Sequence, residues 1–117
     1  MVCLCAWQCS WAQTSYPKKS IDEKARYYTK QMVDSLHVNE REETLLFETN
    51  LQVSKKFDSV YSLQLSNENE RKAAFRAIYQ YRDSCFKSIL PIKEFLRFQD
   101  IEREKWERRK RKESTKN

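Results

Sequence analysis

Apolar side chains recur at helical spacing along most of the chain. The first run opens at Ser20, which forms a capping box with Glu23. Its apolar positions lie three or four residues apart, as one face of an α-helix requires, and they are Ile21, Ala25, Tyr28, Met32 and Leu36. This pattern predicts a helix from Ser20 to about Leu36.

A polar break follows, and its side chains predict a turn at 37–39. Asn39 can accept a hydrogen bond from a backbone N–H two or three residues later, while Glu42 can reach back to the N–H of Asn39. The acidic residues of "NEREE" also suit the positive end of a helix dipole. We therefore expect a second helix from Asn39 to about Leu65. Its apolar stripe comprises Leu46, Phe47, Leu51, Val53, Phe57, Val60 and Tyr61.

Two further helices are expected on either side of Pro91. The third starts at Asn67 or Asn69 and ends near Ile89 or Leu90, because proline disfavours helical geometry in the residue before it. Its apolar face is Ala74, Phe75, Ile78, Tyr81, Cys85, Phe86 and Ile89. The fourth starts at Ile92 and uses Phe95, Leu96, Phe98 and Trp106. Beyond Trp106 the residues are mostly charged and the apolar spacing ends, and residues 113–117 are expected to fray.

The fold class predicted from these runs is all-α, with four helices in antiparallel hairpins. The chain contains no glycine, which excludes glycine-rich phosphate-binding loops and glycine-dependent β-hairpins. Each apolar stripe is modest. A closed bundle remains open as an alternative, but an open cradle or a core shared in a dimer fits a chain this polar better.

Positive charge is concentrated near the C-terminus. The chain has 23 Lys and Arg against 17 Asp and Glu, for a net charge of +6. Residues 103–112, "REKWERRKRK", hold seven basic and two acidic side chains. We therefore expect a basic C-terminal tail at 107–117 after a helical domain at 20–106.

The first twelve residues, "MVCLCAWQCSWA", carry no charge and indicate the remnant of a signal peptide. Ser10 and Ala12 fit the small-residue positions of a cleavage site before Gln13, which leaves 13–19 as a linker. The usual basic segment is missing, so we expect this start to lie inside a longer signal peptide. An apolar tail docked on the helices is the alternative, and a lipoprotein anchor is a weaker one. A membrane span is excluded for this segment, since it would need about 20 apolar residues.

The four cysteines do not predict a metal site. Cys3, Cys5 and Cys9 lie in the expected signal, and their spacing to Cys85 matches no zinc module. After cleavage Cys85 would stand alone, either as a small buried apolar residue or in an intermolecular disulfide.

Two stretches resemble one family. "SLHVNEREE" (35–43) is similar to the motif L-x-L-T-x-x-Q, and "RDSCFKSILPIKEFLRFQ" (82–99) is similar to a second copy. The first copy places Leu36 and Val38 at the leucines, Asn39 at the threonine and Glu42 at the glutamine. The second places Leu90 at the leucine, Pro91 at the threonine and Glu94 at the glutamine, although Pro91 lacks a capping hydroxyl. Over about residues 20–106 the chain therefore resembles the Spy/CpxP-like, LTxxQ-motif group of small periplasmic helical proteins.

This resemblance implies an all-α, cradle-shaped homodimer in the bacterial periplasm. Members of the group act as ATP-independent chaperones or as modulators of envelope and metal stress. The implied partners are unfolded or envelope proteins as clients, and nucleic acid is not expected for an exported chain.

The first functional hypothesis is that a concave helical surface binds partly unfolded or membrane-associated clients. Basic and aromatic side chains alternate on the third helix and would attract acidic and apolar segments together. The candidate contacts are Arg71, Phe75, Arg76, Tyr79, Arg82 and Phe86. The alternative is an ordinary amphipathic helix with a solvated polar face.

The second hypothesis is that the basic end binds a polyanion or an anionic lipid surface. The candidate residues are Lys105, Trp106, Arg108, Arg109, Lys110, Arg111 and Lys112. Here the alternative is a solvated helix end whose positive charge suits the C-terminal dipole.

An enzyme is not expected. The single histidine, His37, lies in a predicted turn, and no nucleophile–base pair stands out from the surface charges. Met32 and His37 with scattered glutamates make a weak metal-ligand set, so we assign neither a metal nor a cofactor.

Overall fold

The structure is a computed structural model that describes residues 20–116. Residues 1–19 and Asn117 lie outside the described residues, and with them the expected signal remnant, the linker, Cys3, Cys5 and Cys9. The four helices are α2 (Ile21–Ser35), α3 (Glu40–Leu63), α4 (Glu68–Ile89) and α5 (Ile92–Lys116). Residues 20–116 contain no strand. Over this described range, the predicted all-α fold with four helices is confirmed.

The predicted caps start the first three helices. Ser20 accepts a hydrogen bond from the N–H of Glu23 at 3.1 Å, which is one half of the capping box expected there. Before α3, the Asn39 side chain accepts from the N–H of Glu42 at 2.8 Å, and Glu42 accepts from the N–H of Asn39 at 3.0 Å. Of the two candidate caps for α4, the structure uses Asn67, whose side chain accepts from two successive N–H groups. Local side-chain chemistry therefore determines where these helices begin.

The end of α3 shows how a chain without glycine makes a helix cap. Gln64 follows Leu63 in the left-handed conformation, with φ 48° and ψ 50°, and its N–H donates to the carbonyl of Tyr61 at 3.2 Å. Glycine usually takes this position because a Cβ atom makes it unfavourable by about 1–2 kcal/mol. The helix therefore stops slightly before the predicted Leu65, and the backbone strain is held at the exposed tip of the α3–α4 hairpin.

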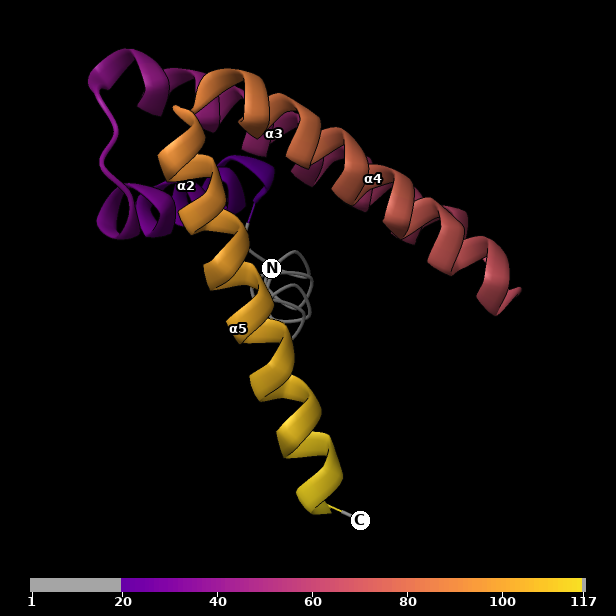
Figure 1. Cartoon of the computed structure of the whole chain (residues 1–117). Helices are drawn as coiled ribbons and strands as arrows, with labels where there is room; N and C mark the ends of the chain where they lie inside the picture. Colours follow the sequence, from indigo (N-terminus) through magenta and orange to yellow (C-terminus); the bar gives the residue numbers. More distant parts are fainter. Residues whose placement is uncertain (1–19, 117) are drawn as a thin grey trace, which may run out of the picture.

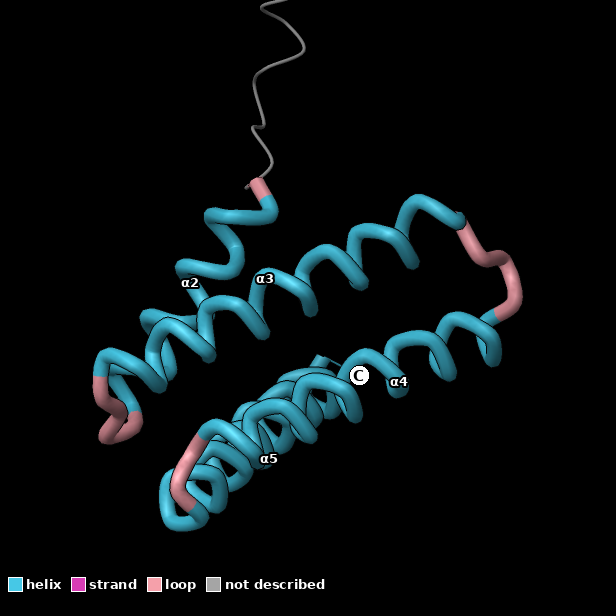
Figure 2. The backbone as a smooth tube through the Cα atoms, turned by 90° about the horizontal axis from the view of Figure 1, so that it is seen from above, coloured by secondary structure: helices cyan, strands magenta, loops and turns pink. Residues whose placement is uncertain are grey.

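The helices form an open, elongated arrangement. α2 reverses into α3, α3 and α4 form a long antiparallel hairpin, and α5 turns away from α4 on the same side of that hairpin as α2 (Figures 1 and 2). The Cα radius of gyration is 18.7 Å and the principal extents are 64 × 42 × 27 Å. A compact domain of about 100 residues has a radius of gyration of roughly 13 Å. The fold is thus an open layer, as the modest apolar stripes favoured, and not a closed bundle.

The core lies at the end of the molecule where the α2–α3 and α4–α5 turns meet. Its buried members are Met32, Leu36, Leu46, Phe86, Leu90, Phe95 and Phe98. The rings of Phe86 and Phe98 meet edge to face with centroids 5.1 Å apart, a favoured aromatic geometry that joins α4 to α5. Leu36 follows the last residue of α2, and Leu90 follows the last residue of α4. Both have extended backbone conformations, and both side chains are buried in this core.

A direct polar contact joins these two turns. Glu94 on α5 is 6% exposed, and its carboxylate accepts a hydrogen bond from the backbone N–H of His37 at 3.3 Å. Glu94 is the third residue of α5, the position from which a capping box would have its carboxylate accept a hydrogen bond from the N–H of the residue before the helix. That residue is Pro91, which has no N–H to donate. Glu94 therefore remains available to accept from the other turn. Nearby, Arg97 donates from Nε to the carbonyl of Ser35 at 2.9 Å and caps the C-terminal end of α2.

The interface between α2 and α3 includes buried polar groups that the hydrophobic pattern did not reveal. Asn50 donates from Nδ2 to Oγ1 of Thr29 at 3.0 Å, and Thr29 donates to the carbonyl of Ala25 at 2.7 Å. Thr49 and Ser54 are also buried. Within residues 20–116 no buried side-chain nitrogen or oxygen lacks a hydrogen-bond partner, so burying these groups leaves no polar atom unsatisfied.

Several side chains assigned to the apolar faces are exposed, which corrects those assignments. Leu96 and Trp106 on α5 are 52% and 54% exposed. The buried residues of this helix are Glu94, Phe95 and Phe98, and Leu96 lies on a different side of the helix from them, while Trp106 lies about two turns beyond the last of them. Tyr28, Tyr61 and Tyr81 are exposed as well. The expected fraying is also corrected for residues 113–116, since α5 continues through Lys116; Asn117 lies outside the described residues.

We predict that removing the carboxylate of Glu94 loosens the contact between the two turns. Glu94→Ala leaves the N–H of His37 without its acceptor and should lower the free energy of unfolding by about 1–3 kcal/mol. Glu94→Gln keeps one acceptor oxygen and should lose less. Urea unfolding followed by circular dichroism measures both. Glu104→Ala, at an exposed position of the same helix, is the control and should change the free energy by less than about 0.5 kcal/mol. An equal loss in Glu94→Ala and Glu104→Ala would contradict this role of Glu94.

Candidate functional site

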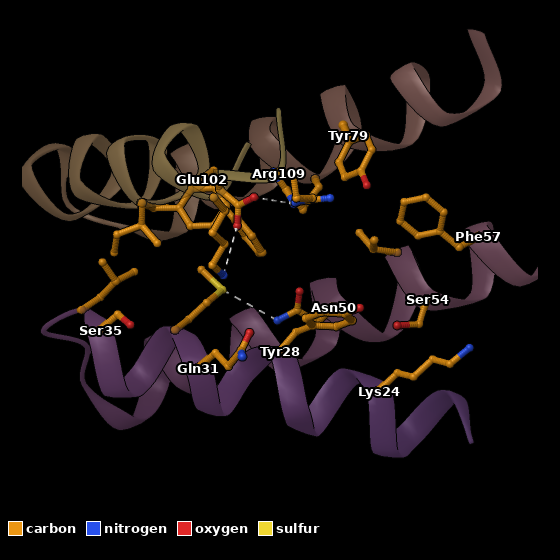
Figure 3. A pocket seen from close by; sticks show the side chains of 18 of the residues that line it. Lys24, Tyr28, Gln31, Ser35, Asn50, Ser54, Phe57, Tyr79, Glu102 and Arg109 are labelled. Atoms are coloured by element: carbon orange, nitrogen blue, oxygen red, sulfur yellow. Dashed lines mark hydrogen bonds and ion pairs between the residues drawn. The ribbon is translucent and has the colours of Figure 1, made fainter. Parts of the chain in front are cut away.

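A cavity of about 380 Å³ lies between the helices, with side chains from all four in its wall (Figure 3). α2 and α5 form opposite sides of it, and the α3–α4 hairpin connects them. α2 and α5 meet at the turn contact and then diverge (Figure 2), and the cavity is lined by residues of both.

The floor of the cavity is mainly apolar. Its buried lining residues are Met32, Leu36, Asn50, Val53, Ser54, Phe86 and Phe98, and Ile101 adds a half-buried side chain. Asn50 is the most polar of these, and its amide is engaged with Thr29 and with Sδ of Met32 at 3.8 Å. The floor therefore offers contact area to an apolar group and has few free hydrogen-bonding groups.

Three tyrosines, Tyr28, Tyr61 and Tyr79, line the cavity while remaining exposed, and so lie at its rim. Phe57 supports two of the rim positions from α3. Its ring lies 5.4 Å from that of Tyr79 and 5.6 Å from that of Phe75, which in turn lies 5.5 Å from Tyr61. This aromatic cluster holds α3 and α4 together beyond the core and positions flat, amphipathic rings beside the opening.

The cavity wall has a positive balance of charge. Four cationic side chains line it, together with the single carboxylate of Glu102. Lys24 comes from α2, Arg82 from α4, and Lys105 and Arg109 from successive turns of α5. Lys105 lies 4.0 Å from Glu102, whereas Lys24 and Arg109 make no ion pair within residues 20–116. Cations therefore approach the opening from both sides.

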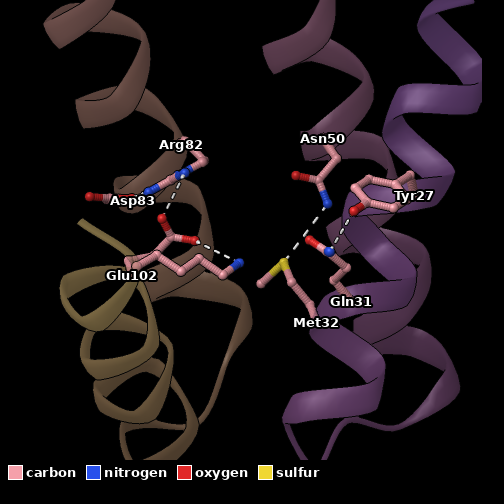
Figure 4. A network of polar contacts seen from close by, with 8 residues as sticks. Tyr27, Gln31, Met32, Asn50, Arg82, Asp83 and Glu102 are labelled. Carbon is pink, nitrogen blue, oxygen red and sulfur yellow. Dashed lines mark hydrogen bonds and ion pairs between the residues drawn. The ribbon is translucent and has the colours of Figure 1, made fainter. Parts of the chain in front are cut away.

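Arg82 has the most enclosed of these charges. Its guanidinium carbon lies 5.0 Å from the ring centre of Tyr79, 5.1 Å from Phe98 and 5.9 Å from Phe86. It pairs with Asp83 at 2.9 Å and lies 4.0 Å from Glu102 (Figure 4). With three ring neighbours and two carboxylates, Arg82 joins α4 to α5 and forms a fixed part of the wall.

Of the six predicted client contacts on α4, three line the cavity and three do not. Tyr79, Arg82 and Phe86 line the cavity, but Phe86 is 1% exposed and belongs to the core, which corrects its assignment as an exposed contact. Phe75 is half-buried in the aromatic cluster between α3 and α4. Arg71 and Arg76 are exposed and do not line the cavity.

The predicted polyanion-binding residues lie on one continuous helix and not on a separate tail. Lys105 and Arg109 face the cavity, in register with Phe98, Ile101 and Glu102. The remaining candidates are exposed: Trp106, Arg108, Lys110, Arg111 and Lys112. The ammonium of Lys110 lies 5.1 Å from the ring centre of Trp106, so this tryptophan is covered partly by a cation from its own helix.

The residues of the two motif copies gather at the two turns. Leu36 and Leu90 share the core, Val38 packs against it, and Asn39 with Glu42 caps α3. Pro91 precedes α5, and its carbonyl accepts from the N–H of Phe95 at 2.9 Å. Glu94 connects the turns as described above. Their observed roles are structural.

Sequence reasoning missed the contribution of α2 to the cavity, above all Lys24. It also treated Lys105 and Arg109 as part of an undivided basic cluster. A signal for their separation was present, because these two residues continue the helical spacing of Phe98 and Ile101 whereas Lys110 and Arg111 do not.

Cys85 lies on another face of α4, half-buried and free. A side-chain hydrogen bond with Cys85, together with partial burial, raises the pKa of Tyr81 above its usual value. The ammonium of Lys56 lies 4.6 Å from the ring centre of Tyr81. Neither Cys85 nor Tyr81 lines the cavity described here.

Between Ser20 and Lys116 no three His, Cys, Asp or Glu side chains come together in a way that could hold a metal ion. No helix in the same range is both long enough and apolar enough to cross a membrane.

Comparison of the chain with protein-family models, with curated proteins and with solved structures finds no match. The resemblance to the Spy/CpxP-like group therefore stays a prediction, which rests on the motif residues at the two turns.

We predict that the planar guanidinium of Arg82, and not its charge alone, stabilises the α4–α5 contact. Arg82→Lys keeps the charge but loses stacking on Tyr79 and Phe98, and should lower the free energy of unfolding by about 1–2 kcal/mol. Thermal and urea unfolding measure the change. Arg76→Lys, exposed on the same helix, is the matched control and should stay within about 0.5 kcal/mol of the parent. A loss in Arg82→Lys no larger than in the control would show that the ring contacts contribute little.

Proposed function

We propose that the protein is a non-enzymatic helical accessory protein that binds unfolded or membrane-associated client proteins. One observation carries this proposal, namely the cavity that combines an apolar floor with a rim of tyrosines and cations. A client segment with apolar and acidic side chains would place the former on the floor and the latter beside Lys24, Lys105 and Arg109. His37 has no catalytic role in this proposal.

The cellular setting of the proposal is the periplasm, with export directed by residues 1–12 and assembly as a homodimer. Its support is the charge-free composition of that segment and the resemblance of the two turn motifs to the Spy/CpxP-like group. The open side of the fold supports assembly indirectly, because an unclosed layer leaves apolar area that a second copy would cover.

The proposal predicts that the full chain suppresses aggregation of a denatured client. Light scattering should fall when the protein is in several-fold excess. Lys105→Gln combined with Arg109→Gln removes two cavity cations and should reduce this suppression by half or more. The control is Lys110→Gln combined with Arg111→Gln, which removes one lysine and one arginine from the same helix outside the cavity and should act like the parent. Absence of suppression by the parent would refute the client-binding proposal.

The alternative function is binding of a polyanion or an anionic lipid surface through the exposed side of α5. The observation that favours it is the continuation of the helix to Lys116, which leaves Arg108, Lys110, Arg111 and Lys112 exposed, with Lys110 against the ring of the exposed Trp106. Salt-sensitive binding to anionic vesicles, weakened by Lys110→Gln with Arg111→Gln and unaffected by Lys105→Gln with Arg109→Gln, would support this function instead.

A further inference from the structure

We propose that the cavity is a binding site for a single-chain anionic amphiphile, such as a fatty carboxylate. This inference names a ligand class for the cavity whose binding role was proposed above, and it rests on that role. Its chemistry follows from three properties of the wall: a mainly apolar floor, a suitable size and an opening flanked by cations.

The floor suits an alkyl chain because most of its buried side chains are apolar. Its two polar side chains are Asn50, whose Nδ2 donates to Thr29, and Ser54. A ligand therefore gains mainly by placing apolar atoms against Met32, Val53 and Phe98. A sugar or nucleotide needs many donors and acceptors, and it would lose its hydration here while finding few of them.

The size of the cavity favours a narrow ligand. A volume of about 380 Å³ lies within the range of about 300–1,000 Å³ found for small-molecule sites. A helix of a partner protein, about 10–12 Å across with its side chains, needs a long groove instead of a space closed at one end by the core. An extended alkyl chain needs no such groove, and its closed end would lie near Leu36 and Phe86.

The cations at the opening favour an amphiphile whose headgroup faces outward and is negatively charged. Lys24 on α2 faces the opening from one side, and Lys105 and Arg109 on α5 from the other, while Glu102 is already engaged by Arg82 and Lys105. A carboxylate at the end of an alkyl chain would meet these cations, whereas a cationic headgroup would be repelled.

The same charge argues against the chain's own α5 as the occupant. A second copy would bring residues 103–112, with seven basic and two acidic side chains, to an opening that is already positive. Such an arrangement places like charges together and costs free energy. A small anion neutralises the opening instead.

Calorimetric titration of the full chain with dodecanoate, below its micelle concentration, tests the proposal. We expect one binding event per chain. Lys105→Gln with Arg109→Gln should weaken it at least about tenfold, whereas Lys110→Gln with Arg111→Gln should stay within about twofold of the parent. Dodecyltrimethylammonium, which has the same chain and the opposite charge, should bind at least about tenfold more weakly than dodecanoate.

A second variant tests the position of the alkyl chain without changing any charge. Ile101→Trp enlarges a half-buried side chain in the cavity wall and should weaken dodecanoate binding by at least about tenfold. Leu96→Trp, at an exposed position of the same helix, should not. Circular dichroism establishes that each variant keeps the helical content of the parent.

Three results would overturn the proposal: no binding of dodecanoate, equal binding of the cationic amphiphile, or equal affinities in the cavity and control pairs. These outcomes are distinct from failure of the client-binding function. Aggregation suppression without dodecanoate binding would leave the client function and remove the amphiphile site, while dodecanoate binding without suppression would do the reverse.

Discussion

The hydrogen bond from the N–H of His37 to the buried carboxylate of Glu94 is the constraint on which the open fold depends. It joins two helix turns that are far apart in the sequence, and Arg97 reinforces it at the end of α2. The apolar core surrounds this contact, so the two helical hairpins are joined firmly at one end. Away from it α2 and α5 separate (Figure 2), and the cavity lies between them.

Pro91, directly before α5, explains why Glu94 is free to make this contact. In the turn before α3, Asn39 and Glu42 satisfy one another, and the capping box is complete within the helix end. Before α5 the corresponding exchange is blocked because Pro91 has no N–H. Because Pro91 departs from the motif, the carboxylate of Glu94 has no local N–H to accept from and instead binds the N–H of His37. The hydrogen bond that would have capped α5 locally is replaced by one that connects the two hairpins.

Helix boundaries could be predicted from the sequence because caps and proline act through neighbouring residues, as Asn39, Asn67 and Pro91 show. The partner of Glu94 could not, since nothing near Glu94 indicates that its acceptor function is directed to His37. Trp106 was misassigned for a related reason. A stripe at helical spacing shows that a helix has an apolar face, but not that another element is present to cover it. The cavity cations were found only in part, because Lys24 reaches the site through the placement of α2.

The length of α5 has a kinetic consequence for anything negatively charged that approaches the cavity. At 25 residues the helix is roughly 37 Å long, and its positive charge is concentrated on the part that extends beyond the core. A charged arm of this kind produces a field that guides anions by electrostatic steering, raising the association rate at low ionic strength. Since Lys105 and Arg109 lie on the same helix, anions collected along the arm would be delivered toward the opening. Added salt should then lower the association rate by a larger factor than it raises the dissociation rate.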